Sequence, residues 1–187
     1  MEDLEKVIGE GRALYLSFDS SSRQLGAQSW SAELVSLTYG EDGPEEGEQL
    51  ASAVLVRAHR WDSDWWDSFD AESSDLAEVG EAFRDMDLIE TLDEGATFAD
   101  SIVVLDFVGV PREKRGSQLS HALARGIAYI FRNDIVALIP DANGVDEAGR
   151  VVSDRMKEAG LRSHWERGGF ITVPGTSVMM LPLSVRP

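Results

Sequence analysis

The chain has no cysteine, and this absence excludes three kinds of chemistry. Disulfide crosslinks, a thiolate nucleophile and cysteine-based zinc sites all require that residue. No run of about 18 apolar residues occurs either, so we expect no membrane-spanning helix and no membrane partner. The first residues, M-E-D-L-E, lack the basic and apolar segments of a secretory signal, so we expect a cytoplasmic protein.

Basic residues are scarce as well. The chain carries 17 Lys and Arg against 34 Asp and Glu, a formal net charge of −17, which argues against a nucleic-acid partner. The imbalance lies in residues 1–100, with 25 acidic and six basic residues, whereas residues 101–187 have nine and 11. An anionic ligand would therefore prefer the second half and a cationic ligand the first. The alternative is an acidic surface that only keeps the protein soluble.

The N-terminal half, residues 1–100, predicts strands and an inserted helical segment. Apolar and β-branched residues indicate three strands, over residues 13–18, 32–39 and 50–58. An acidic, turn-rich loop, residues 40–48, lies between the second strand and the third. Residues 61–69 are aromatic and acidic, and we expect Trp61, Trp65, Trp66 and Phe69 to pack this insertion onto the sheet; the alternative is that they form a wall of a ligand site. Asp75 and Glu78 then resemble a capping box that begins one helix over residues 75–92.

The C-terminal half shows sharper patterns. Residues 102–110 are almost continuously apolar, as in a strand covered on both faces, and residues 117–132 have full amphipathic helical spacing. A second buried strand (134–139), a helix (145–159) capped by Gly160 and a hairpin (171–173 with 177–181) follow. The fold class is therefore α/β with a mixed sheet, and the length suits one domain over residues 1–187.

The best candidate site is the loop V-P-R-E-K-R-G-S-Q-L-S, residues 110–120, between that strand and helix. A helix start presents unpaired backbone N–H groups and a positive dipole end, and Arg112, Lys114 and Arg115 add three cations. A pyrophosphate suits such an arrangement. The alternative is a basic strand-to-helix loop without a ligand.

Two motifs resemble the GNAT superfamily of N-acyltransferases. In that family, a buried strand ending in Val precedes a loop of the form Arg/Gln-x-x-Gly-x-Gly/Ala, matched here by Val110, Arg115 and the R-G pair with Gly116. W-E-R-G-G-F, residues 165–170, matches the family's aromatic and Gly-Phe ending of the last helix before a hairpin. The resemblance covers residues 101–183. It implies a central mixed sheet flanked by helices, with the helical insertion before the central strand and residues 101–187 as the acyl-CoA-binding half.

The resemblance also implies acetyl-CoA as cosubstrate and an amine as acyl acceptor. The residues implied to bind acetyl-CoA are Val108, Val110, Arg112, Lys114, Arg115, Gly116, Ser117, Gln118, Leu119 and Ser120. Asp106, near the place where the family has a carboxylate, is the expected general base; its alternative is a structural carboxylate. His164 is the expected proton donor, and no residue pattern suggests a metal site.

Three positions differ from the family pattern: Gln118 and Ser120 replace glycines of the loop, and Trp165 replaces a Tyr that serves as general acid. Because Gln118 is expected inside the first helical turn, a glycine there would destabilise the helix. These differences support an alternative function, a binding or regulatory protein of the same fold without catalysis. The acceptor, a polyamine, an aminoglycoside-like molecule or a protein amino group, and a monomeric or homodimeric state stay open.

Overall fold

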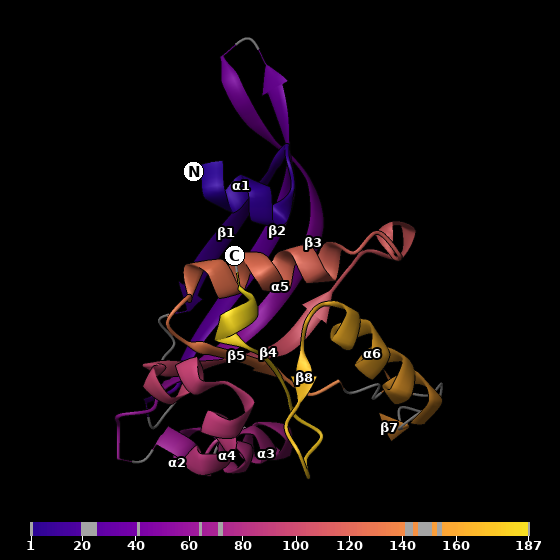
Figure 1. Cartoon of the computed structure of the whole chain (residues 1–187). Coiled ribbons are helices and arrows are strands. Elements are labelled where there is room, and N and C mark those ends of the chain that lie inside the picture. The colour runs from indigo at the N-terminus through magenta and orange to yellow at the C-terminus, as the bar shows by residue number, and fades with distance from the viewer. Residues whose placement is uncertain are drawn as a thin grey trace.

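The computed structural model describes residues 2–19, 26–40, 42–63, 65–70, 73–140, 144–145, 151–152 and 155–186. Its centre is a seven-stranded sheet (Figure 1), in the order β1 (Arg12–Asp19), β2 (Gln28–Gly40), β3 (Gly43–His59), β4 (Ser101–Gly109), β5 (Ile135–Leu138), β9 (Met179–Leu181), β8 (Ile171–Thr172). Only β4 and β5 pair in parallel, so the predicted α/β class with a mixed sheet is confirmed. A separate two-stranded sheet joins β6 (Gly144–Val145) to β7 (Val151–Val152).

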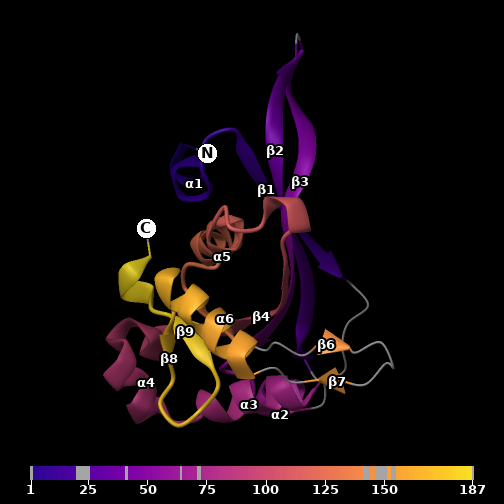
Figure 2. The same ribbon diagram turned by 90° about the vertical axis from the view of Figure 1, so that its right-hand side faces the viewer.

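Helices flank this sheet and divide the core in two. The helices are α1 (Glu2–Ile8), α2 (Trp65–Asp70), α3 (Ser74–Ala82), α4 (Met86–Leu92), α5 (Leu119–Ile130) and α6 (Arg155–Arg167). One buried cluster packs α1, α5 and α6 against the sheet, and the other packs α2, α3 and α4 (Figure 2). Successive residues of β4 alternate between the clusters, with Val103 and Leu105 in the first and Ile102 and Val104 in the second. The predicted two-sided burial of this strand is confirmed for these residues.

The crossover from β4 to β5 is the feature that positions the candidate site. Helix α5 connects the two strands, and Ile102, Val103 and Val104 of β4 pair with Ile135, Val136 and Ala137 of β5. Apolar side chains at helical spacing, including Leu123 and Ile127, bury one face of α5. The predicted strand, helix and strand of this segment are confirmed with boundaries shifted by one or two residues.

Three predictions for the strands and helices of the N-terminal half are wrong. Strands β2 and β3 continue through the predicted loop, pairing as far as Gly40 with Gly43, and project as an arm beyond the rest of the molecule (Figure 1). The single helix over residues 75–92 is two helices, because Asp85 caps α4 by accepting a hydrogen bond from the Leu88 N–H. Ser73, rather than Asp75, caps α3.

The aromatic insertion packs as expected except at one residue. Trp65 and Phe69 lie in the buried cluster beneath α3, and Trp66 packs against its edge. Trp61, in contrast, is 72% exposed, so its predicted packing onto the sheet is wrong. Among the described residues no helix is long and apolar enough to cross a membrane.

The last helix also differs from the prediction, which placed it at residues 145–159. Residues 144–145 and 151–152 form the strands β6 and β7, residues 146–150 lie outside the described residues, and α6 runs through Gly160 to Arg167. Gly160 is therefore a mid-helix residue and not a cap. The helix continues because Trp165, five residues later, is buried against the sheet. The predicted hairpin of β8 and β9 is confirmed.

Candidate functional site

The two central strands part where the candidate site begins. Strand β4 continues to Gly109, but its pairing with β5 ends at Val104 and Ala137. Beyond this point the edge of β4 that faces β5 makes no ladder hydrogen bonds to any residue that the structure describes. Unpaired strand edges bind peptide-like groups readily, because their N–H and C=O groups need partners.

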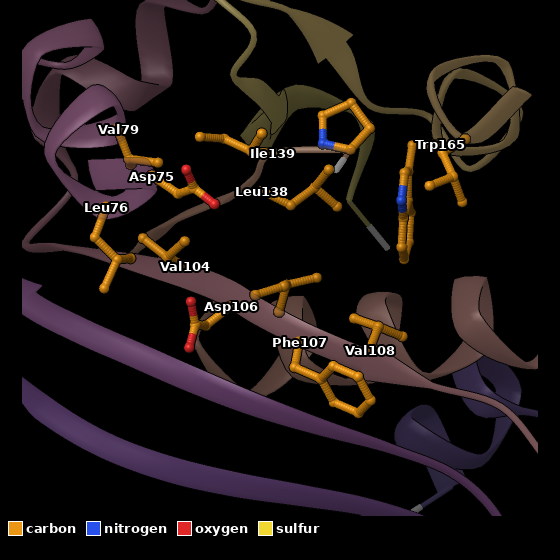
Figure 3. Close-up of a pocket in the computed structure, with 13 residues that line it drawn as sticks. Asp75, Leu76, Val79, Val104, Asp106, Phe107, Val108, Leu138, Ile139 and Trp165 are labelled. Carbon is orange, nitrogen blue, oxygen red and sulfur yellow. The ribbon is translucent and has the colours of Figure 1, made fainter. Parts of the chain in front are cut away.

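A cavity of about 370 Å³ opens between the parted strands, and we call it the strand cavity (Figure 3). Residues from Val104 to Val108 of β4 form one wall, and Leu138, Ile139 and Pro140 form another. Helix α3 contributes Asp75, Leu76 and Val79, and α6 contributes Leu161 and Trp165. The lining is mostly apolar, with carboxylates from two different elements.

Asp106, the predicted general base, lies in the strand cavity at an irregularity of β4. Val54 of β3 pairs with Phe107, and Leu55 pairs with Leu105, so Asp106 is the extra residue of a β-bulge. Its side chain is exposed, in contrast to the five buried residues before it. Among the described residues it makes no hydrogen bond or ion pair, so the alternative of a structurally satisfied carboxylate has no support there.

A second cavity, of about 410 Å³, lies over the basic loop, and we call it the loop cavity. Nine of the ten residues predicted to bind acetyl-CoA line it: Val108, Val110, Lys114, Arg115, Gly116, Ser117, Gln118, Leu119 and Ser120. Arg112 does not line it; it is exposed in the 3₁₀ turn Arg112–Lys114. The sequence thus identified a set of residues that lie together, and their binding of acetyl-CoA stays a prediction.

The charges around the loop cavity differ in their partners. The Nζ atom of Lys114 lies 2.6 Å from the Oε2 atom of Glu48 on the projecting arm, which offsets its charge. Arg115 donates only from Nε, to the backbone oxygen of Val110 at 3.3 Å. Its terminal nitrogens have no partner among the described residues, so Arg115 is the cation best placed to bind an anion in this cavity.

The backbone of the loop prepares the same cavity for an anion. Gly116 has φ 86° and Gln118 has φ 57°, and Gln118 is the single non-glycine residue with positive φ in the described part of the chain. The prediction that Gln118 lies inside the first turn of the helix is wrong. Gln118 is the N-cap residue of α5, but its side chain accepts no hydrogen bond from the helix. It therefore leaves the first N–H groups of the helix without a side-chain cap. Glycine adopts this left-handed conformation more easily than other residues do.

His164 lies at the loop cavity and not at the strand cavity. Its Nε2 atom is 2.8 Å from the Oγ atom of Ser120, and its ring stacks on that of His121 with centroids 4.1 Å apart. The His121 Nε2 group donates to the His164 backbone oxygen at 2.9 Å. Burial lowers the pKa of both imidazoles. The charge of His164 lowers the pKa of His121 further, and the charge of Arg167 lowers the pKa of both. The two predicted catalytic residues, Asp106 and His164, are therefore not brought to one cavity.

Three residues connect the cavities. Val108, Leu161 and Trp165 line both of them, so the loop cavity and the strand cavity are adjacent along β4 and α6. The Trp165 ring is buried and packs against Phe170 with centroids 5.3 Å apart. A ligand with an anionic end at the loop and a narrow apolar part between the strands would pass this indole.

Sequence reasoning missed several residues of the site. The sequence assigns Asp75 to a capping box, yet it lines the strand cavity opposite β4, and no sequence pattern indicates Leu161 or Pro140 as site residues. No sequence spacing links α3 to β4, so this proximity has no local signal. Within the described residues no group of three or more His, Asp or Glu side chains could hold a metal ion.

Comparison with known proteins adds no relative. No family model matches the chain, and no curated protein or solved structure matches it either. The function must therefore be argued from the geometry and chemistry of the two cavities.

Proposed function

We propose that the chain binds an acyl-CoA thioester along the loop and strand cavities and transfers its acyl group to an amine. In this proposal it is a GNAT-like N-acyltransferase, with acetyl-CoA as cosubstrate. The observation that carries the proposal is the adjacency of a basic loop, at a helix start that Gln118 does not cap, and a cavity between two strands. Coenzyme A combines a pyrophosphate with a slender pantetheine arm that ends in the thioester.

The order of elements supports a GNAT-type fold. The resemblance implies a buried strand, a basic loop, a helix, a parallel strand, a last helix and a hairpin. Strand β4, the loop, α5, β5, α6 and the β8–β9 hairpin follow one another in this order. A chain with the two motifs but another order of elements would not support the proposal.

The loop offers the pyrophosphate two kinds of donor. The first N–H groups of α5 are uncapped, and the positive end of the helix dipole favours an anion there. Arg115 adds a guanidinium, and hydrogen bonds from charged donors are about twice as strong as neutral ones. The Gln118 side chain is exposed, so in this proposal it turns away from the bound phosphates.

The pantetheine arm would lie along the unpaired edge of β4. Its two amide groups resemble peptide groups, and they would pair with the backbone of β4 beyond Val104 as an added strand does. This places the thioester near the bulge at Asp106. The apolar walls of the strand cavity, such as Leu138 and Ile139, would exclude water from the arm.

The chemistry proposed for the strand cavity is direct transfer. Asp106 takes a proton from the acceptor ammonium, and the neutral amine attacks the thioester carbonyl carbon. The new N–C bond forms, the C–S bond breaks, and the thiolate leaves and takes its proton from water. We assign no proton-donor role to His164, because it lines the loop cavity and bonds Ser120.

Charge indicates the class of acceptor. Asp75 and Asp106 both line the strand cavity, and the N-terminal half around it is strongly acidic. A cationic amine is attracted to such a surface and a carboxylate or phosphate is repelled. The acceptor is therefore a polyamine, an aminoglycoside-like molecule or a protein amino group.

One observation favours a second candidate function. Trp165 stands at the junction of the cavities, and an indole offers no proton that a leaving thiolate could take. A protein that binds CoA without catalysis would need no such proton. Binding of acetyl-CoA without turnover would support this second function.

The test is a measurement of thiol release. The full chain is incubated with acetyl-CoA and, in separate reactions, with spermidine, an aminoglycoside and a lysine-containing peptide, and free CoA thiol is followed with a chromogenic disulfide. Amine-dependent release, with an acetylated product detected by mass spectrometry, supports transfer. No release with any amine, by a protein that binds acetyl-CoA, rejects transfer in favour of the binding protein.

A further inference from the structure

A third cavity, of about 660 Å³, shares no lining residue with the strand and loop cavities. It is formed by α1, α5, the turn after α6, β9 and the C-terminal 3₁₀ turn Leu183–Val185. Figures 1 and 2 both show α1, α5 and the C-terminal segment as neighbours on one face of the sheet. We call it the α1–α5 cavity.

The lining of this cavity is apolar with charges of one sign. Val7, Leu181 and Val185 contribute apolar surface, and the charged residues are Lys6, Arg125 and Arg186. No Asp or Glu lines the cavity, in a chain with twice as many acidic as basic residues. A concave surface with this composition complements an anion that has an apolar body.

Arg186 is the buried part of this positive lining. Its guanidinium donates to the backbone oxygens of Phe131, Asp134 and Leu181, at 3.3, 2.6 and 3.0 Å. Burial lowers its pKa to about 10, opposed by the charges of Asp93 and Asp134, so it stays protonated at neutral pH. Its Nε group is buried without a hydrogen-bond partner. The cation is thus fixed in place, and only part of its hydrogen-bonding capacity is used.

Arg125 and Tyr129 add two further donors to the lining. They are four residues apart on α5, so they lie on the same face of the helix. Neither side chain makes a hydrogen bond to the other side chains that the structure describes. A guanidinium and a phenol hydroxyl at this spacing can both donate to one carboxylate.

We propose that the α1–α5 cavity binds a small amphipathic carboxylate, with its carboxylate at Arg125 and Tyr129 and its apolar body against Val7 and Leu181. A small molecule is favoured because the volume lies in the range of about 300–1,000 Å³ that is typical of such sites. The site is separate from the acyl-CoA site and does not depend on the function proposed for the other cavities.

Octanoate is a suitable probe, with octan-1-ol and octylamine as controls of the same chain length. Titration into the full ¹⁵N-labelled chain, followed by NMR, should show saturable binding of octanoate with a Kd below about 1 mM. The shifted amides should include Gly168, Gly169 and Leu181 and exclude Gly116. Octanol and octylamine should bind at least about tenfold more weakly, because they lack the anion.

Arg125→Gln should weaken octanoate binding about tenfold, because a charged donor is lost. Arg132→Gln is the matched control, since Arg132 is an exposed arginine just after α5 that does not line the cavity, and it should leave the Kd unchanged. Circular dichroism verifies that the variants are folded, which we expect because both side chains are exposed. Equal Kd values for the two variants, equal binding of octanol, or shifts confined to the loop would each overturn the proposal.

Discussion

The Nε2 atom of His164 lies 2.8 Å from the Oγ atom of Ser120, which ties the end of α6 to the first turn of α5. The contact connects residues 44 positions apart and closes one side of the loop cavity. His121 stacks on the same imidazole and donates to its backbone oxygen. A pair of partly buried histidines thus holds the two helices that frame the proposed pyrophosphate site.

This pair predicts the direction in which stability changes with pH. Burial lowers the pKa of His121 and of His164 below the ordinary value, so the unfolded chain binds protons at about pH 6.5 where the folded chain does not. The free energy of unfolding should therefore fall as the pH drops from about 7.5 to about 5.5. Urea denaturation across this range measures it. The double variant His121→Asn, His164→Gln should have a flatter profile, and an equally steep one would contradict the assignment.

The left-handed conformation of Gln118 predicts that glycine is tolerated there. Glycine removes a backbone strain of about 1 kcal/mol from the folded state, but it also raises the conformational entropy of the unfolded chain, which costs a similar amount. The free energy of unfolding should therefore change by less than about 0.5 kcal/mol. Gln118→Val keeps the strain and adds a branched side chain, so it should cost about 1 kcal/mol or more. Denaturation curves test both. A clear loss with glycine would show that the Gln118 side chain itself stabilises the loop.

Gln118→Gly is also informative for ligand binding. If the loop holds the pyrophosphate through its backbone, the variant should bind CoA with equal or improved affinity, because glycine allows closer approach. Calorimetry measures this. A wild type that binds CoA and a glycine variant that does not would make Gln118 a direct ligand, and the loop would then bind CoA in another way.

Two helical glycines should respond in opposite directions to alanine. A Cβ atom at Gly126 of α5 would lie 2.6 Å from Ile8 and 2.8 Å from Leu14, so Gly126→Ala should destabilise the protein by about 1–3 kcal/mol. Gly160 of α6 has no atom within 4 Å of such a Cβ, and Gly160→Ala should stabilise by about 0.5–1 kcal/mol. Thermal and urea unfolding check the pair. A neutral Gly126→Ala would contradict the close packing of α1 and β1 on α5.

A substitution of Asp106 should change catalytic turnover without changing CoA binding. If it is the general base, Asp106→Asn should lower amine-dependent turnover by about 100-fold or more and leave CoA affinity unchanged. Asp100→Asn is the matched control, because Asp100 is an exposed carboxylate outside both cavities. Thiol release and calorimetry on the same preparations give the two quantities. Full activity of the Asp106 variant would remove this residue from the mechanism.

The parts of the fold that the sequence predicts best are those with a strong burial pattern. Strand β4 is a short apolar run rich in β-branched residues, which is typical of a strand buried on both faces. Helix α5 carries apolar residues on one face at helical spacing. The sequence predicts a loop where β3 begins, because residues 43–48 bury no side chain and show no alternation. The sequence predicts a helix end at Gly160, because it does not distinguish a glycine that caps a helix from one that is tolerated in an exposed helix interior.

The candidate site also has a part that the sequence predicts and a part that it does not. The loop residues were predictable because they are consecutive and carry a basic, glycine-containing pattern. The strand cavity was only partly predictable, because it depends on where β4 and β5 stop pairing and on Asp75 arriving from a distant helix. His164 lies away from Asp106 of β4 because it occupies the side of α6 toward α5, whereas its neighbour Trp165 packs toward the sheet.

The central claim is that one acyl-CoA molecule occupies the loop and strand cavities. Its most direct test is calorimetric titration of CoA into the wild type, Arg115→Gln and the control Arg132→Gln. We expect saturable binding by the wild type, about tenfold weaker binding by the Arg115 variant and unchanged binding by the control, because Arg115 lines the loop cavity and Arg132 does not. No binding by the wild type, or equal affinities for the two variants, would contradict it.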